Sequence, residues 1–169
     1  MSDQPRFPDC VNQSLIEPSP LNAIGAYGFS IEWIDCASPY RMCIVIVQEN
    51  GERSYAIRDE RRFRRTKHGV ESTCLWKGRL LIPNEVFDAS CNRIVSAGAT
   101  DAESVPFDPD GLDGELFVVK MKFGLIDQRV CFAWPEAKSI GQMRILKREC
   151  DHFLNLPRSD FIGKPRAAK

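Results

Sequence analysis

The chain has 169 residues, 43% of them hydrophobic, and its 23 Lys and Arg residues balance its 23 Asp and Glu residues. That length allows one ordinary domain with its own core, and the neutral total counts against a protein that binds nucleic acid over a large basic surface. No stretch approaches the ~18 apolar residues of a membrane span, and the polar start lacks a signal-peptide pattern, so we expect a cytoplasmic protein.

Composition divides the chain into a body with two loose ends. Residues 1–21 hold four prolines among polar residues, which predicts a flexible arm. We expect an N-terminal β extension over 22–57, the main domain over 58–156 and a flexible basic tail over 157–169.

Short β-rich segments separated by turn residues recur along the body. An Asn50-Gly51 pair between two of them is typical of a hairpin turn, since this pair tolerates positive φ. The succession favours a mainly β fold, an antiparallel barrel or sandwich. The predicted strands are 29–35, 41–48, 53–58, 80–82, 86–94, 116–123 and 130–134.

One helix is expected near the end of the body. Leu146, Cys150, Phe153 and Leu154 fall at i, i+4, i+7 and i+8, the spacing of an apolar helix face, whereas the preceding Gly141 fits a strand better. Four aromatic residues at strand positions are predicted to fill the core: Phe117, Phe123, Phe132 and Trp134.

The seven cysteines are odd in number and scattered, and several lie in apolar runs, which indicates reduced core thiols. The two histidines, His68 and His152, do not fall at zinc-ligand spacing, and no Cys–His pair suits nucleophilic catalysis. We therefore expect no metal, no cofactor and no enzymatic activity.

The most unusual feature is a basic run over 58–67, with six cationic residues against two acidic ones. Such a run is most often a solvated surface. Arginine predominates, however, and its planar fork favours phosphate or a nucleotide-like partner. We predict that Arg61, Arg62 and Arg65 are exposed at the barrel edge, because nothing nearby in sequence could neutralise six cations in a core.

The order of features over 58–156 resembles a PilZ domain. The resemblance rests on the Arg61-x-x-x-Arg65 spacing, on the segments 78–82 and 87–99, and on the aromatic ending 129–143. It implies a six-stranded antiparallel β-barrel with a C-terminal helix, and a bacterial signalling protein whose regulatory ligand is cyclic di-GMP.

The resemblance also implies the ligand-binding residues. In the family's second motif, Asp/Asn-x-Ser-x-x-Gly, Gly98 matches, but Arg93 and Val95 replace the acceptor and the hydroxyl that face guanine. Binding is therefore expected to be weakened or absent. The implied ligand-binding residues are Arg58, Arg61, Arg62, Arg65, Arg93, Ser96 and Gly98.

Three hypotheses follow for function. One is a PilZ-type effector that acts through protein–protein contacts, and another is a ligand-independent PilZ-like adaptor. The third is a small nucleic-acid-binding barrel in which Phe63, Tyr55 or Trp76 stacks on bases. A protein partner is expected in the first two, and a homo-oligomer is left open.

Overall fold

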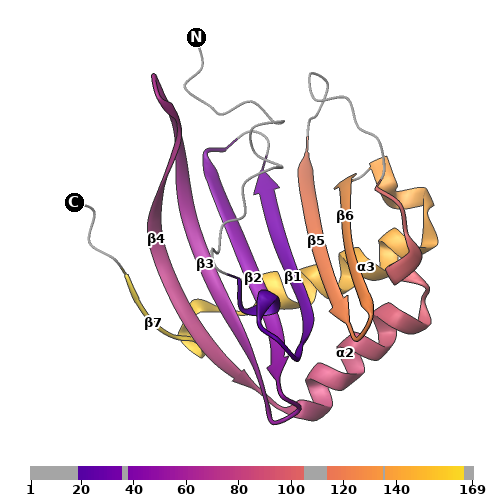
Figure 1. Ribbon diagram of the computed structural model, residues 1–169. Helices are drawn as coiled ribbons and strands as arrows, with labels where there is room; N and C mark the ends of the chain where they lie inside the picture. The colour runs from indigo at the N-terminus through magenta and orange to yellow at the C-terminus, as the bar shows by residue number, and fades with distance from the viewer. Residues whose placement is uncertain (1–18, 36–37, 105–113, 135, 166–169) are drawn as a thin grey trace.

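The computed structural model describes residues 19–35, 38–104, 114–134 and 136–165, with the backbone alone for Arg65, Glu136, Lys164 and Pro165. These residues form one antiparallel sheet in the order β6-β5-β1-β2-β3-β4-β7 (Figure 1). The strands are β1 (Ala26–Asp35), β2 (Tyr40–Glu49), β3 (Arg53–Thr66), β4 (Gly69–Ile82), β5 (Glu115–Phe123), β6 (Ile126–Trp134) and β7 (Ile162–Pro165).

The predicted mainly β class is confirmed, but the sheet is not closed into a barrel. Over the described residues β6 and β7 are the edge strands, and no pairing joins them. Two helices, α2 (Asn84–Ser96) and α3 (Gly141–Leu154), cover one face instead. Because the helices bury that apolar face, the sheet has no need to close on itself.

The main core lies between this face and the two helices. Phe29 of β1 packs edge-to-face on Phe153 of α3, and Tyr27 approaches Phe87 of α2. Phe117, Phe123 and Phe132 are buried as predicted, and Trp134 is partly buried at the edge of the same core. No helix in the described part of the chain is long and apolar enough to cross a membrane.

Helix α2 replaces the strand that we predicted over 86–94. Its buried residues Phe87, Cys91 and Ile94 fall at i, i+4 and i+7, which is helical spacing rather than strand alternation. The helix begins after Pro83 and is followed by Gly98, whose φ of 69° lies in the left-handed region that favours glycine.

The other elements differ mainly in length. Asn50 and Gly51 have φ values of 51° and 71°, so the predicted hairpin turn joins β2 to β3. Helix α3 is confirmed and begins at Gly141, which we had expected in a strand. Strand β3 continues past the predicted 53–58 to Thr66 and returns as β4, so most of the basic run belongs to a strand.

The two ends of the body are also arranged differently from the prediction. Residues 26–57 supply the central strands β1 and β2 and the start of β3, which pair with the rest of the sheet and form no separate layer. After α3 come a short 3-10 helix, η4 (Arg158–Asp160), a buried Phe161 and β7, so 157–165 is not a loose tail. Residues 1–18 and 166–169 lie outside the described residues.

Candidate functional site

The basic run is neutralised in part by its own two acids. Side chains alternate between the faces of a strand, so residues at i and i+2 share a face. In β3 this places Arg58 beside Glu60 on the face that carries the helices, and Asp59 beside Arg61 on the opposite face. Our prediction that nothing nearby could neutralise these cations is wrong, because it did not consider the pairing of acid and base at i and i+2 on a strand.

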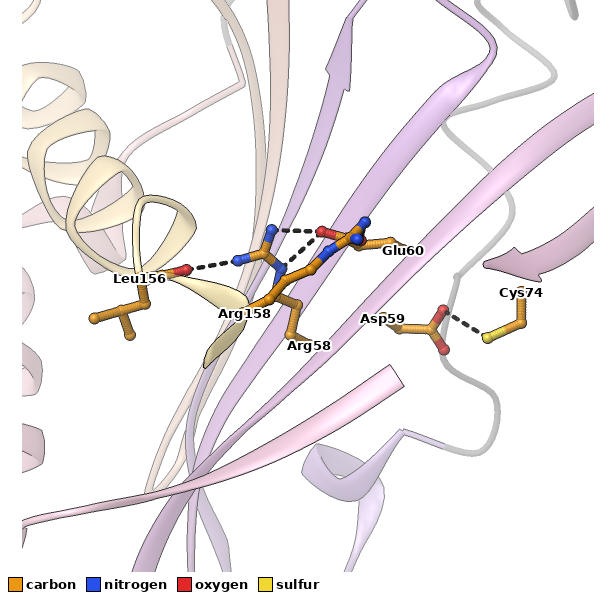
Figure 2. Close-up of polar contacts among 6 residues, drawn as sticks. All are labelled: Arg58, Asp59, Glu60, Cys74, Leu156 and Arg158. Atoms are coloured by element: carbon orange, nitrogen blue, oxygen red, sulfur yellow. Dashed lines mark hydrogen bonds and ion pairs between the residues drawn. The ribbon is translucent and has the colours of Figure 1, made fainter. Parts of the chain in front are cut away.

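On the helix-covered face, Glu60 is shared by two arginines (Figure 2). Arg58 Nε donates to Glu60 Oε1 at 2.9 Å, and Arg58 Nη1 donates to the carbonyl oxygen of Leu156 at 2.6 Å. Arg158 Nη2, from η4, donates to the other Glu60 oxygen. Arg58 and Glu60 are buried, whereas the Arg158 side chain is 57% exposed.

Aromatic rings hold the C-terminal segment against this cluster. Trp76 of β4 meets Phe161 edge-to-face, with 5.8 Å between ring centroids, and the Arg158 guanidinium lies 5.6 Å from the Trp76 centroid. The Trp76 ring lies close to Gly78 and Gly163, where an added Cβ would come within 2.3 and 2.7 Å of ring atoms. The two glycines therefore make the space in which the ring sits.

A β-bulge interrupts β4 at the same level. Glu60 pairs with Trp76 but Arg61 pairs with Cys74, which leaves Leu75 as an extra residue in the ladder. Bulges of this kind reorient side chains and are frequent next to functional sites.

Beside the bulge is a pocket of about 340 Å³. Its walls combine apolar and aromatic side chains with the carboxylate and guanidinium described above. Trp33 is fixed by a hydrogen bond of 3.1 Å from its Nε1 to Glu115 Oε1, and Tyr40 is 47% exposed. The lining residues are Trp33, Tyr40, Arg41, Met42, Glu60, Arg61, Leu75 and Arg158.

On the opposite face, Asp59 is fully buried and holds Arg61 in a two-pronged contact. Arg61 Nε donates to Asp59 Oδ1 at 2.9 Å and Nη2 donates to Oδ2 at 3.2 Å, which raises the pKa of Arg61. The Cys74 thiol is 3.9 Å from the same carboxylate (Figure 2). Burial, together with the negative charges of Glu32 and Asp59, raises the pKa of the neighbouring Cys43 thiol well above its usual range.

These thiols are free, as predicted. Cys43, Cys91, Cys131 and Cys150 are buried and Cys74 is partly exposed. Burial raises the pKa of Cys91 to about 12, so this thiol stays protonated at neutral pH. Within the described residues, no group of three or more His, Cys, Asp or Glu side chains is arranged to hold a metal ion.

The second half of the predicted ligand site lies elsewhere. Arg93 of α2 donates from Nε to Glu149 Oε1 of α3 at 2.6 Å, and Ser90 Oγ donates to Glu149 Oε2 at 2.7 Å. Burial alone would raise the pKa of Glu149, but the hydrogen bonds from Arg93 and Ser90 outweigh it and the pKa is lowered. Ser96 is exposed, and the Gly98 carbonyl accepts a hydrogen bond from Gln142 at 3.4 Å.

The structure therefore does not bring the predicted ligand residues into one site. Arg61 lies on the face of the sheet opposite α2, which carries Arg93. Arg62 is exposed and pairs with Thr73. Thr73 lies nine positions before Ile82, the last residue of β4 before α2, a distance of about 30 Å at ~3.3 Å per residue. The Arg65 side chain lies outside what is described.

Of the pocket-lining residues, sequence reasoning singled out Arg61 as ligand-binding and missed the others. Glu60 could have been found by treating Arg58-Asp-Glu-Arg61 as a strand, since acid and base then fall at i and i+2 on both faces. Nothing in the sequence indicates the pairing of Glu60 with Arg158, which is 98 residues away.

Comparison with known proteins assigns no relative. No protein-family model matches the chain, and neither a curated protein nor a solved structure matches it.

Proposed function

We propose that the protein is a regulatory ligand-binding protein, and that its ligand is a small anion with a flat or apolar body that enters the pocket beside Glu60 and Arg158. The observation that carries this proposal is one carboxylate shared by two arginines at the wall of an otherwise largely apolar pocket.

Charge supports an anionic ligand. Two guanidinium groups and one carboxylate leave this cluster with a net charge of +1. Arg58 uses all three of its nitrogens on Glu60 and Leu156, but Arg158 uses one nitrogen and is largely exposed. A ligand carboxylate or phosphate can therefore bind Arg158 while Arg58 still neutralises Glu60, so no buried charge is left without a partner.

The pocket walls support a flat or apolar ligand body. Trp33, Met42 and Leu75 come from three different strands, and Trp33 is held in place by Glu115. A volume of 340 Å³ is near the lower limit for ligand sites, enough for about one ring system with its charged group.

A regulatory role is favoured over catalysis because the eight lining residues include no histidine, cysteine or serine, and the one carboxylate among them is committed to two arginines. Cyclic di-GMP, which the PilZ resemblance implies, stays a prediction. Its guanine and phosphate groups have the right chemistry for Trp33 and Arg158, so it is one of the probes in the test.

Isothermal titration calorimetry tests the proposal with cyclic di-GMP, GMP and indole-3-acetate, and with guanosine and indole as uncharged counterparts. We expect at least one anion to bind saturably and its uncharged counterpart to bind more weakly. Arg158→Gln should weaken binding at least about tenfold, because a hydrogen bond to a charged group contributes roughly 1.5–3 kcal/mol.

The matched control is Arg144→Gln, which removes an exposed arginine from α3 and should leave binding unchanged. The proposal fails if none of the three anions binds, or if Arg158→Gln and Arg144→Gln bind them equally well.

A further inference from the structure

Beyond the pocket, β3 and β4 continue as a two-stranded ribbon, which we define as residues 62–73. The pairing of β2 with β3 ends at Tyr40 and Arg62, and the pairing of β7 with β4 covers only Trp76–Arg79. In Figure 1 the turn between β3 and β4 extends past the ends of β1 and β2. Over most of its length the ribbon therefore pairs only with itself.

The ribbon is basic in a chain that is neutral. It contains Arg62, Arg64, Arg65 and Lys67 against one acid, Glu71, a net charge of 4 − 1 = +3 with His68 neutral. The remainder of the chain then carries 19 cationic and 22 acidic residues, a net charge of −3. The ribbon thus carries an excess of positive charge, whereas the rest of the chain carries an equal excess of negative charge.

Within the described residues, the arginines at the base of the ribbon have ion-pair partners and the exposed arginines along it do not. Arg58 and Arg61, at its base, are committed to Glu60 and Asp59. Arg62 and Arg64 are exposed, and neither forms an ion pair among the described residues. Their guanidinium groups are therefore available to bind an anionic partner outside the protein.

The geometry favours the phosphate backbone of a duplex. Arg62 and Arg64 share one face of β3 and are about 6.6 Å apart along the strand, so both guanidinium groups can contact phosphates of the same DNA strand. A two-stranded ribbon also fits the major groove of B-form DNA, whereas the deep, narrow major groove of A-form RNA excludes it.

Base stacking on single strands is less well supported. Phe63, Tyr55 and Trp76, which we had considered as stacking residues, are all buried. Phe63 is covered by the Arg41 guanidinium, 4.1 Å from the ring centroid, and Tyr55 by that of Arg79 at 3.9 Å. The described part of the ribbon therefore offers charge but no exposed Phe, Tyr or Trp side chain.

We propose that the β3–β4 ribbon is a contact arm for double-stranded DNA, in which Arg62 and Arg64 bind backbone phosphates without reading the base sequence. This proposal does not depend on the pocket ligand, since Arg62 and Arg64 are not among the pocket-lining residues.

Fluorescence anisotropy with a labelled 20-base-pair DNA duplex tests it over a series of salt concentrations. The variant is Arg62→Ser with Arg64→Ser. Its control, Arg144→Ser with Arg148→Ser, removes the same charge from exposed positions of α3. We expect the ribbon variant to weaken binding at least tenfold and the control to change it less than twofold. Loss of two phosphate contacts should also flatten the slope of log Kobs against log salt by about 1.8.

Thermal unfolding of both variants checks that each is folded, and because all four side chains are exposed we expect Tm values close to that of the parent. The proposal is overturned if the duplex does not bind at low salt, or if the two variants lose affinity equally. It is also overturned if single-stranded DNA, duplex RNA or polyglutamate of matched charge competes better than the DNA duplex.

Discussion

Two clusters in this protein use the same chemistry in different surroundings. In each, a buried glutamate accepts hydrogen bonds from a partly exposed arginine and from a second donor: Glu149 from Arg93 and Ser90 between the helices, and Glu60 from Arg158 and Arg58 on the sheet. We call Glu149, Arg93 and Ser90 the helix cluster, and Glu60, Arg58 and Arg158 the sheet cluster. None of the helix-cluster residues lines the pocket, whereas Glu60 and Arg158 of the sheet cluster form part of its wall.

The comparison separates a structural contact from a candidate site. Glu149 has one exposed arginine and one neutral donor, so its cluster has no net charge and joins α2 to α3. Glu60 has two arginines, so its cluster keeps one positive charge next to open space. A buried ion pair by itself is weak evidence for function. Excess charge beside a pocket is what marks the sheet cluster as the candidate site.

The largest expected effect comes from removing each glutamate. Glu60→Ala leaves the buried Arg58 without its counter-ion and should lower the free energy of unfolding by about 3–5 kcal/mol. Glu149→Ala should lower it by about 2–3 kcal/mol, because Arg93 is half-exposed and can be solvated while only Ser90 is left buried and unpaired. Urea unfolding measures both values.

A double variant checks the cause of the first effect. Arg58→Met with Glu60→Leu removes both buried charges and should recover most of the stability that Glu60→Ala loses. If the double variant is no more stable than the single one, the loss reflects packing rather than an unpaired charge, and the contrast between the two clusters is weaker than we describe.

A smaller effect is expected at Gly78, which affects the sheet cluster alone. Gly78→Ala would place a Cβ 2.3 Å from Trp76 Cη2 and 2.9 Å from Phe161 Cβ, so the ring has to move and the contact with the C-terminal segment is disturbed. We expect a loss of about 2 kcal/mol in urea unfolding. Gly141→Ala is the control, since its nearest neighbour would be 3.8 Å away and stability should hardly change.

Substitution of Arg158 and of Arg93 should separate the effect on stability from the effect on ligand binding. Arg158→Gln should cost less than about 1 kcal/mol of stability but weaken binding of the pocket ligand, because Arg158 is largely exposed and Arg58 still neutralises Glu60. Arg93→Gln should leave the pocket ligand unaffected, since Arg93 lies between the helices. Urea unfolding measures the stability of both variants, and calorimetry measures their ligand affinity. Loss of ligand binding in Arg93→Gln would contradict the assignment of the ligand to the pocket beside Arg158.

The smallest effect concerns pH. The pKa of Glu149 is lowered in the folded protein, so the ionised carboxylate contributes stability that is present above its unfolded pKa and is lost as the pH falls through the folded value. The stability difference between the parent and Glu149→Gln should therefore shrink from about pH 5 downwards. Urea unfolding at pH values from 7 to 3 measures it, with the exposed Glu103→Gln as control. A difference that stays constant over this range would contradict the role given to the charge.

Those elements of the fold that depend on neighbouring residues in the sequence could be predicted. Asn50-Gly51 and the apolar spacing of Leu146, Cys150 and Phe153 require no distant partner, and both predictions are confirmed. The segment 86–94 was predicted wrongly because it was assigned to the succession of short strands, although Phe87, Cys91 and Ile94 have helical spacing.

The candidate site was less predictable because its parts are distant in sequence. Arg58 was singled out, but as an exposed ligand-binding residue rather than as the buried partner of Glu60. Trp33, Leu75 and Arg158 meet only through the pairing of strands and the return of the chain after α3, and the bulge that leaves Leu75 unpaired has no local signal.

The return of the chain has a consequence for biosynthesis. Arg158 and Leu156 each contact a β3 residue 98 positions earlier in the chain. A ribosome that adds roughly 5–20 residues per second needs about 5–20 seconds to make this interval. During that time a nascent chain has β3 but lacks the residues that complete its polar cluster. Contacts of such long sequence separation form slowly, so the pocket should be among the last parts of the protein to mature, and ligand present during translation would meet an incomplete site.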